Sequence, residues 1–176
     1  KRALRNLEVE LEISPNINLD EWVSLYNCLI DRHGITDIRK FSRQSFSKQI
    51  AIPNTHYFKV RYQGRTIGGN LFYIHGRIAY AHLSAFTKEG YDLGAPYAVK
   101  WVALDYLSHF VDFINFGGGT NQNNGLDLFK QGWSNMTRKS IFCGKILDHQ
   151  KYSLIVKDLN NQDSNWFPAY RDSEHF

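Results

Sequence analysis

Three short strand-like segments joined by tight glycine turns constrain the fold of this chain more than any other feature of its sequence. They cover Tyr57–Tyr62, Thr66–Ile74 and Ile78–Phe86, and the turns between them contain Gly64 and Gly76. Segments of this length, rich in aromatic and β-branched residues and joined by such short loops, are typical of hydrogen-bonded antiparallel neighbours. The sequence therefore predicts an antiparallel meander at its centre.

Two helices and one further strand are predicted before this meander. Apolar residues alternate with glutamates over Leu7–Ile13, which predicts a half-exposed strand, although a helix remains an alternative for residues 1–8. Asn18 is a good helix N-cap and Gly34 a good helix stop. Helical spacing between them predicts one helix, and Ile38–Ile50 a second, shorter one.

The second half of the chain predicts a mixture of helices and strands. The expected elements are a long helix opening at Gly94-Ala95-Pro96, a strand over Phe113–Phe116, a short helix over Leu126–Gly132, a strand over Lys139–Leu147, and a helix or strand over Tyr152–Leu159. The resulting order is β-α-α-β-β-β-α-β-α-β. This order predicts a mixed α/β (α+β) domain with a central, mostly antiparallel mixed sheet flanked by helices.

Composition narrows the class of protein. A chain of 176 residues fits one domain, and a hydrophobic content of 43% excludes wholesale disorder. Cys28 and Cys143 form no disulfide framework, so we expect a reducing, cytoplasmic compartment. No apolar run long enough for a membrane span occurs. Because the sequence begins with Lys1 rather than Met, we expect it to be part of a longer protein.

Several enzyme classes lack their motifs here. The sequence contains no HExxH, CxxC, Walker loop or Gly-x-Ser-x-Gly, and its seven histidines show no metal-ligand spacing. We therefore expect no metal, and no serine-hydrolase or redox chemistry.

The element order resembles that of the GNAT acyltransferases. In that fold the fourth and fifth strands splay apart and the acyl carrier enters between them, which here means between Ile78–Phe86 and Phe113–Phe116. The N–H groups that open the following helix can hold a pyrophosphate, because they lack helical partners and lie at the positive end of the helix dipole. Gly94 and Ala95 are thus candidates for binding a carrier such as acetyl-CoA.

The candidate phosphate segment Gly90–Pro96 departs from the usual GNAT motif. Tyr91 stands where an Arg or Gln is usual, Asp92 adds a negative charge, and Pro96 removes an N–H donor. A plain loop before the long helix is the alternative interpretation.

Four further motifs follow one another in a fixed order. They are His82-Leu83-Ser84, Phe116-Gly117-Gly118-Gly119-Thr120, Phe129-Lys130-Gln131-Gly132-Trp133 and Phe142-Cys143-Gly144. This succession resembles the C-terminal half of FemABX-like acyltransferases, which have two GNAT-like domains. The resemblance implies that residues 1–176 form one GNAT-like domain, the second half of a two-domain protein. It also implies either an aminoacyl-tRNA donor with a cell-wall precursor peptide as acceptor, or an acyl-CoA donor.

The resemblance also implies a role for Lys130, the lysine of the Phe-Lys motif, at the acyl donor and its reacting carbonyl. Acyl transfer builds negative charge on the carbonyl oxygen, and one fixed donor stabilises it by about 3–4 kcal/mol. A surface or helix-capping lysine is the alternative. We expect Gly117, Gly118 and Gly119 to allow close approach of the carrier, and Ser84 to take part in its binding.

His82 is the candidate general base for the acceptor amine, since an ordinary histidine pKa of about 6.5 suits neutral pH. Tyr80 lies one strand period away on the same face and can share this role, and Asp105 is a weaker candidate. A structural histidine with both ring nitrogens hydrogen-bonded is the alternative.

The sequence thus predicts an N-acyltransferase that moves an acyl or aminoacyl group from an activated carrier to an amine. A catalytically silent GNAT-like half that binds a peptide or carrier is the first alternative. RNA binding through Arg39, Lys40, Arg43 and Lys48 is the second, although such a basic run is typical of a solvated helix face. A cleft between the two strands that is lined by Lys130, His82 and the glycines would favour the enzyme. A cleft that is filled by Phe116 or Trp133 would favour the silent half.

Overall fold

The computed structural model describes residues 5–36, 40–118, 125–141 and 143–172. The chain divides into two compact units, Lys1–Lys130 and Gln131–Phe176. That residues 1–176 form one domain of a longer protein stays a prediction.

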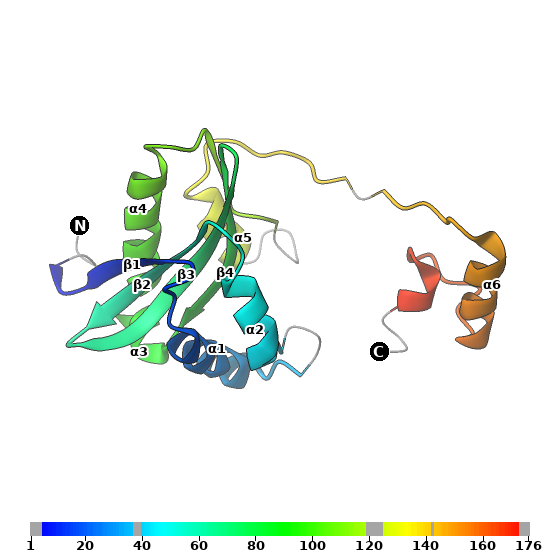
Figure 1. Ribbon diagram of the computed structural model, residues 1–176, viewed down its shortest axis with the longest axis horizontal. Helices are drawn as coiled ribbons and strands as arrows, with labels where there is room; N and C mark the ends of the chain where they lie inside the picture. Colours follow the sequence, from blue (N-terminus) through cyan, green and yellow to red (C-terminus); the bar gives the residue numbers. More distant parts are fainter. Residues whose placement is uncertain (1–4, 37–39, 119–124, 142, 173–176) are drawn as a thin grey trace. The chain divides into compact units, whose positions relative to one another are not determined.

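The first unit is built on a five-stranded sheet. Its strands follow chain order across the sheet: β1 (Glu8–Ile13), β2 (Thr55–Tyr62), β3 (Arg65–His75), β4 (Ile78–Phe86) and β5 (Phe113–Asn115). The first three pairs are antiparallel, and β4 pairs with β5 in parallel (Figure 1). Gly64 and Gly76 have positive φ in the two hairpin turns. The meander and the mixed, mostly antiparallel sheet are therefore confirmed.

Helices cover both faces of this sheet. They are α1 (Leu19–His33), α2 (Arg43–Ile50), α3 (Lys88–Asp92), α4 (Ala95–Leu107) and α5 (Gly125–Gln131). The Asn18 side chain accepts a hydrogen bond from the Glu21 N–H and caps α1, and Gly34 ends it at φ 58°. The second helix is shorter than predicted, because Ser42 caps it and its first residue is Arg43. Ile38 lies outside the described residues.

Two apolar cores lie on opposite faces of the sheet. α1 and α2 bury Trp22 and Phe46 against Tyr57, Leu71 and other inward residues of the strands. On the other face α4 contributes Ala98, Val99, Ala103 and Leu107 to a second core. The strand residues of this core include Phe58, Val60, Ile67 and Phe72. Adjacent residues of one strand thus serve different cores, as the pleat requires.

The second unit contains the helix α6 (His149–Asp158) and the short 3-10 helix η2 (Ala169–Arg171). Asp148 caps α6 by accepting a hydrogen bond from the Lys151 N–H, so the ambiguous segment is a helix. The Tyr152 hydroxyl accepts a hydrogen bond from the Ala169 N–H, and the buried Asn161 side chain donates one to the Ala169 carbonyl. These bonds tie η2 to α6.

The prediction of a strand over Lys139–Leu147 is wrong for the described residues of that range, none of which is in a strand. Ile141 and Leu147 are 76% and 89% exposed. Alternation of apolar residues suits one face of a sheet, but a strand also needs a hydrogen-bonded neighbour. The final strand of the predicted order is therefore missing from the described residues. None of the described helices combines the length and apolar character needed to cross a bilayer.

Buried charge holds the edge of the sheet together. The Lys59 ammonium in β2 is 8% exposed and pairs with the carboxylates of Glu10 and Glu12 in β1 and Glu21 in α1. Burial alone lowers the Lys59 pKa, but these carboxylates outweigh it, so the pKa is raised. The lysine therefore stays charged in the folded protein.

Replacement of Lys59 by Met is expected to destabilise the fold at neutral pH. It leaves three carboxylates facing one another, and we expect a loss of roughly 2–4 kcal/mol, since removing one partner of a buried ion pair is costly but these carboxylates are partly exposed. Protonation relieves the repulsion, so the loss should shrink near pH 4. Urea unfolding at both pH values measures it, with exposed Lys88→Met as control. An equal loss at both pH values would contradict this account.

Candidate functional site

The pairing of β4 with β5 ends after three residues. Ile78, Ala79 and Tyr80 are aligned with Phe113, Ile114 and Asn115, after which β5 stops while β4 continues to Phe86. Residues 81–86 of β4 therefore have no described strand neighbour on this side. We call this region, residues 81–86 together with Phe116, Gly117 and Gly118 after β5, the fork. The pairing thus ends between the two strands where the element order predicts an opening.

A β-bulge in β4 decides which side chains face which side of the fork. Asn70 of β3 is aligned with Ser84, and Phe72 with Ala81, so His82 and Leu83 together oppose the single residue Leu71. A bulge adds one residue to one strand and so reverses its alternation. Tyr80 and His82 therefore face α1 and α2, whereas Ser84 faces α4 together with Asn70.

Lys130 lies at the end of β5. Its Nζ donates a hydrogen bond to the Gly118 carbonyl oxygen over 2.7 Å. The preceding Gly117 has a φ of 69° and donates its N–H to the Asn115 side chain, which turns the chain at this point. A ring contact of 5.3 Å between Tyr97 and Phe129 joins α5 to α4. The structure thus brings Lys130, Gly117 and Gly118 together; Gly119 lies outside the described residues.

The environment of Lys130 is partly buried. Burial lowers the pKa of its ammonium, and the carboxylate of Asp127 one turn earlier opposes this effect. Lys130 is thus partly exposed, and its role at a carbonyl stays a prediction. A cation that gives up its proton more easily than usual can donate a strong hydrogen bond to a carbonyl oxygen that gains negative charge.

His82 and Tyr80 approach the fork from the other face of the sheet. The His82 Nε2 lies 2.9 Å from the Gln49 Oε1 in α2, and its ring lies against that of Tyr73, with centroids 4.5 Å apart. Burial lowers the His82 pKa below its ordinary value. The histidine and Lys130 thus belong to opposite faces of the sheet.

The candidate phosphate segment is folded on itself. The Gly90 N–H donates to the Thr87 side chain, the Leu93 N–H to the Glu89 carbonyl and the Gly94 N–H to the Tyr91 carbonyl. These residues form α3 and the turn after it, an element that the sequence did not predict. These three N–H groups are therefore engaged by Thr87 and by the segment itself.

Packing gives a separate reason for glycine in this segment. A Cβ on Gly90 would lie 2.3 Å from the Ile67 carbonyl oxygen, so this position excludes larger residues. Gly94 has a φ of 76° and precedes α4, and Ala95 is completely buried. That Gly94 and Ala95 bind the carrier stays a prediction.

Lys100 and Asn70 are polar residues of this region that the sequence interpretation missed. The Lys100 side chain runs from α4 to the sheet, is 8% exposed, and donates from Nζ to the Asn70 Oδ1 over 3.0 Å. Burial, together with the charge of Lys130, lowers the Lys100 pKa to about 8. The helical spacing could have predicted this position. Lys100, Ala103 and Leu107 lie three and four residues apart, which places the lysine on the buried face of α4.

Phe116 lies next to Lys100. The Lys100 Nζ is 4.6 Å from the centre of the Phe116 ring and 5.3 Å from that of Phe72. Phe116 is half-buried and occupies the α4 side of the fork. Trp133 belongs to the second unit.

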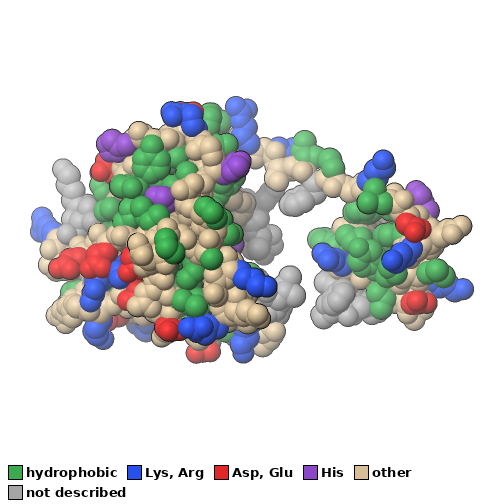
Figure 2. Space-filling view, viewed as in Figure 1, with side chains coloured by type: hydrophobic (Ala, Val, Ile, Leu, Met, Phe, Trp, Pro, Cys, Tyr) green, Lys and Arg blue, Asp and Glu red, His purple; other side chains and the backbone are tan. Residues whose placement is uncertain are grey.

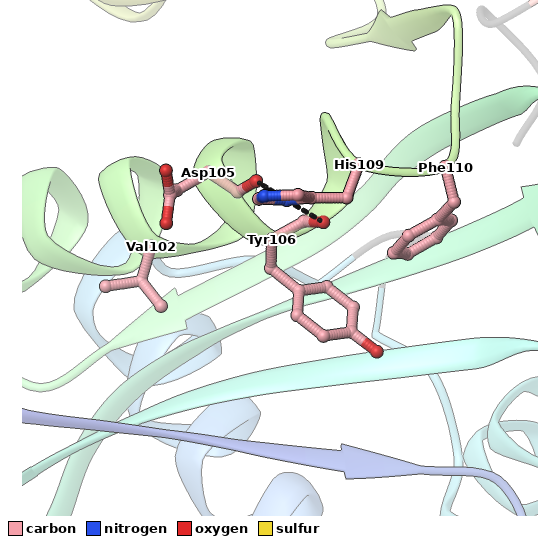
Figure 3. Close-up of a pocket in the computed structure, with 5 residues that line it drawn as sticks. All are labelled: Val102, Asp105, Tyr106, His109 and Phe110. Atoms are coloured by element: carbon pink, nitrogen blue, oxygen red, sulfur yellow. Dashed lines mark hydrogen bonds between the residues drawn. The ribbon is translucent and has the colours of Figure 1, made fainter.

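A separate groove lies away from the fork. A groove of about 510 Å³ at the C-terminal end of α4 is lined by Val102, Asp105, Tyr106, His109 and Phe110 (Figure 3). Asp105, the weaker base candidate, therefore belongs to this groove. No group of three or more His, Cys, Asp or Glu side chains that could hold a metal ion occurs among the residues that the structure describes.

Little in the structure favours RNA binding. Arg43 of the basic run pairs with Asp20 at 2.8 Å, and Arg39 lies outside the described residues. Basic and acidic side chains are interspersed on the face that Figure 2 shows. Arg43 and Lys48 are thus better explained as part of the solvated face of α2, and Lys40 precedes that helix.

Comparisons with known proteins identify the fold. No protein-family model and no curated protein sequence matches the chain. Among solved structures, an aminoglycoside acetyltransferase from an uncultured soil metagenomic sample, in complex with sisomicin, matches with a TM-score of 0.62 and 11% identity, over 81% of this chain and 97% of that one.

Two further structures agree with this match. A ribosomal-protein-alanine N-acetyltransferase from Brucella melitensis biovar Abortus 2308 has a TM-score of 0.56 and 12% identity, over 78% of this chain and 99% of that one. A GNAT-family acetyltransferase from Streptococcus pneumoniae TIGR4 has a TM-score of 0.53 and 9% identity, over 79% of this chain and 99% of that one. The mixed sheet with its flanking helices is therefore that of the GNAT acetyltransferases, and the chain has the GNAT fold.

Proposed function

We propose that this chain is an N-acyltransferase that transfers an acyl or aminoacyl group from an activated carrier to an amine at the fork. The observation that carries the proposal is the position of Lys130, whose ammonium donates to the Gly118 carbonyl just beyond the end of the β4–β5 pairing in a GNAT fold. In this proposal the donor's carbonyl oxygen takes the place of the Gly118 oxygen on the Lys130 Nζ.

The physical role of Lys130 follows from the charge that develops during attack. When the acceptor nitrogen adds to the acyl carbon, the carbonyl oxygen gains a negative charge, and a cation already held in place stabilises it without further reorganisation. The ammonium must stay protonated for this role. Because the Lys130 pKa is lowered, activity should fall at alkaline pH earlier than an ordinary lysine would allow.

Aminoacyl-tRNA is the donor that we favour, and acetyl-CoA is the second candidate. The reason is the folded segment before α4, in which the N–H groups of Gly90, Leu93 and Gly94 already have partners. A pyrophosphate gripped there would have to displace those bonds. The resemblance to FemABX-like proteins supports a cell-wall precursor peptide as acceptor.

A catalytically silent GNAT-like half is the second candidate function. Phe116 favours it, since its half-buried ring lies against Lys100 on the α4 side of the fork and takes up part of the space that a carrier would need.

Binding of the donor is expected to stabilise the protein against heat. A ligand at 100 times its Kd contributes about 2.7 kcal/mol, which a thermal-shift assay detects readily. We expect charged tRNA to raise the Tm, and CoA and acetyl-CoA to raise it less or not at all. A large shift with CoA alone would contradict the preference for tRNA, and no shift with any carrier would favour the silent half.

Replacement of Lys130 by Met is expected to lower kcat by about 10²–10³-fold, the usual cost of removing one oxyanion donor. The assay follows transfer from charged tRNA or acetyl-CoA to a lysine-containing pentapeptide by mass spectrometry. Lys130→Arg keeps the charge and should retain more activity than Lys130→Met. Exposed Lys48→Met is the matched control, and equal activity of Lys130→Met and this control would refute the role of Lys130.

A further inference from the structure

The Lys100 ammonium lies over β4, within the sheet's buried face. Asn70, which binds it, is in β3, and Phe116, whose ring lies below it, follows β5. In the sheet β4 lies between β3 and β5. The Nζ therefore reaches the α4 side of β4 where that strand has lost its partner β5.

Asn70 fixes this position. Its amide nitrogen donates to the carbonyls of Leu71 and Leu83, over 3.1 and 3.0 Å, so its Oδ1 must point to Lys100. Leu83 is one of the two bulge residues of β4. One side chain thus links the irregular part of β4 to the lysine.

No carboxylate balances this buried lysine among the described residues. The charge that acts on it is another cation, Lys130, while Asp127 acts on Lys130. β3 and β4 present the uncharged Asn70 and Ser84 on this face. Other charged or titratable groups on elements that pack against α4 are engaged elsewhere: His56 against Tyr106 and Phe110, Lys88 with Asp92, Glu89 with Arg65, and Lys59 and Arg61 with the acidic residues of β1.

The surroundings of Lys100 favour an amine that can lose its proton. The described residues around it do not provide the carboxylate partner that a structural ion pair needs. A buried ammonium with one acceptor among the described side chains, and with aromatic neighbours, is costly, and an apolar side chain would fill the same space without that cost. A neutral amine in this place keeps a lone pair and still donates to Asn70.

We propose that Lys100 is a catalytic residue of the reaction, and that its amine accepts the proton that the acceptor ammonium loses before it attacks. This inference rests on the proposed function. The neutral Nζ takes one proton from the acceptor, whose freed lone pair forms the new C–N bond. The bond from carbon to the carrier then breaks, and the leaving oxygen or sulfur takes the second proton of the attacking nitrogen. Lys100 finally returns its proton to water.

The two candidate bases, Lys100 and His82, should give different pH profiles of kcat. A base acts when it is unprotonated, so kcat should rise with pH through about 8 if Lys100 accepts the proton. If His82 accepts it, the rise should lie below 6.5, because burial lowers the His82 pKa. The acceptor's own ionisation is the same in every variant, so variants separate it from that of the enzyme.

The test is the pH dependence of kcat for the wild type and for Lys100→Met, Asn70→Asp and His82→Gln, with charged tRNA or acetyl-CoA and the lysine-containing pentapeptide. Asn70→Asp places a carboxylate beside the ammonium, which favours its charged form and should move the rise to higher pH. Lys100→Met should abolish the rise near 8 and lower kcat at least about 10²-fold, the lower range for general bases. His82→Gln should leave the rise in place.

Titration of ¹⁵N-labelled lysine side chains by NMR gives a second readout that needs no substrate, and its main result comes from the wild-type protein. The wild type should show one Nζ that titrates near 8, and Asn70→Asp should raise its midpoint. An Nζ of Lys100 that titrates like an exposed lysine would overturn the proposal.

The outcomes separate the two proposals. If Lys130→Met loses activity while Lys100→Met and Asn70→Asp keep the wild-type pH profile, Lys100 is not the base although the proposed function stands. If the rise lies below 6.5 and disappears in His82→Gln, the histidine is the base. If no donor supports transfer in the wild type, the proposed function fails, and the assignment of Lys100 fails with it.

Discussion

The early end of the β4–β5 ladder is the constraint on which the rest of this structure depends. Parallel pairing lasts only from Ile78 to Tyr80, because β5 is three residues long and its chain turns at Gly117. A strand that loses its neighbour exposes backbone donors and acceptors, which a ligand or another group can then use. The functional proposals all concern this unpaired half of β4.

The bulge at His82 and Leu83 gives the two sides of the fork different chemistry. Without it, Ser84 would share a face with Tyr80 and His82, whereas the extra residue turns Ser84 toward α4. The α4 side then carries lysines and an asparagine, and the opposite side carries a histidine and tyrosines. If His82 is the base, proton transfer and carbonyl binding by Lys130 take place on opposite faces. If Lys100 is the base, both take place on the α4 side.

The segment before α4 illustrates how one sequence pattern can serve two purposes. Glycines ahead of a helix are typical of a phosphate loop, but here Gly90 is needed for its close approach to the Ile67 carbonyl, and the loop N–H groups bond to the loop itself. Steric packing explains this glycine as well as ligand binding does. The glycines of this segment therefore do not identify the acyl carrier.

Local signals in the sequence determined most elements of the first unit. Alternation over Leu7–Ile13, the cap at Asn18 and the turns at Gly64 and Gly76 act through neighbouring residues, so their effect could be predicted without a fold. The absence of a strand in the described part of Lys139–Leu147 could not, because a strand depends on a distant partner. Only the tertiary structure decided where β4 and β5 part and that Lys100 is buried beside Asn70 and Phe116, since burial and electrostatic environment arise from segments that the sequence keeps far apart.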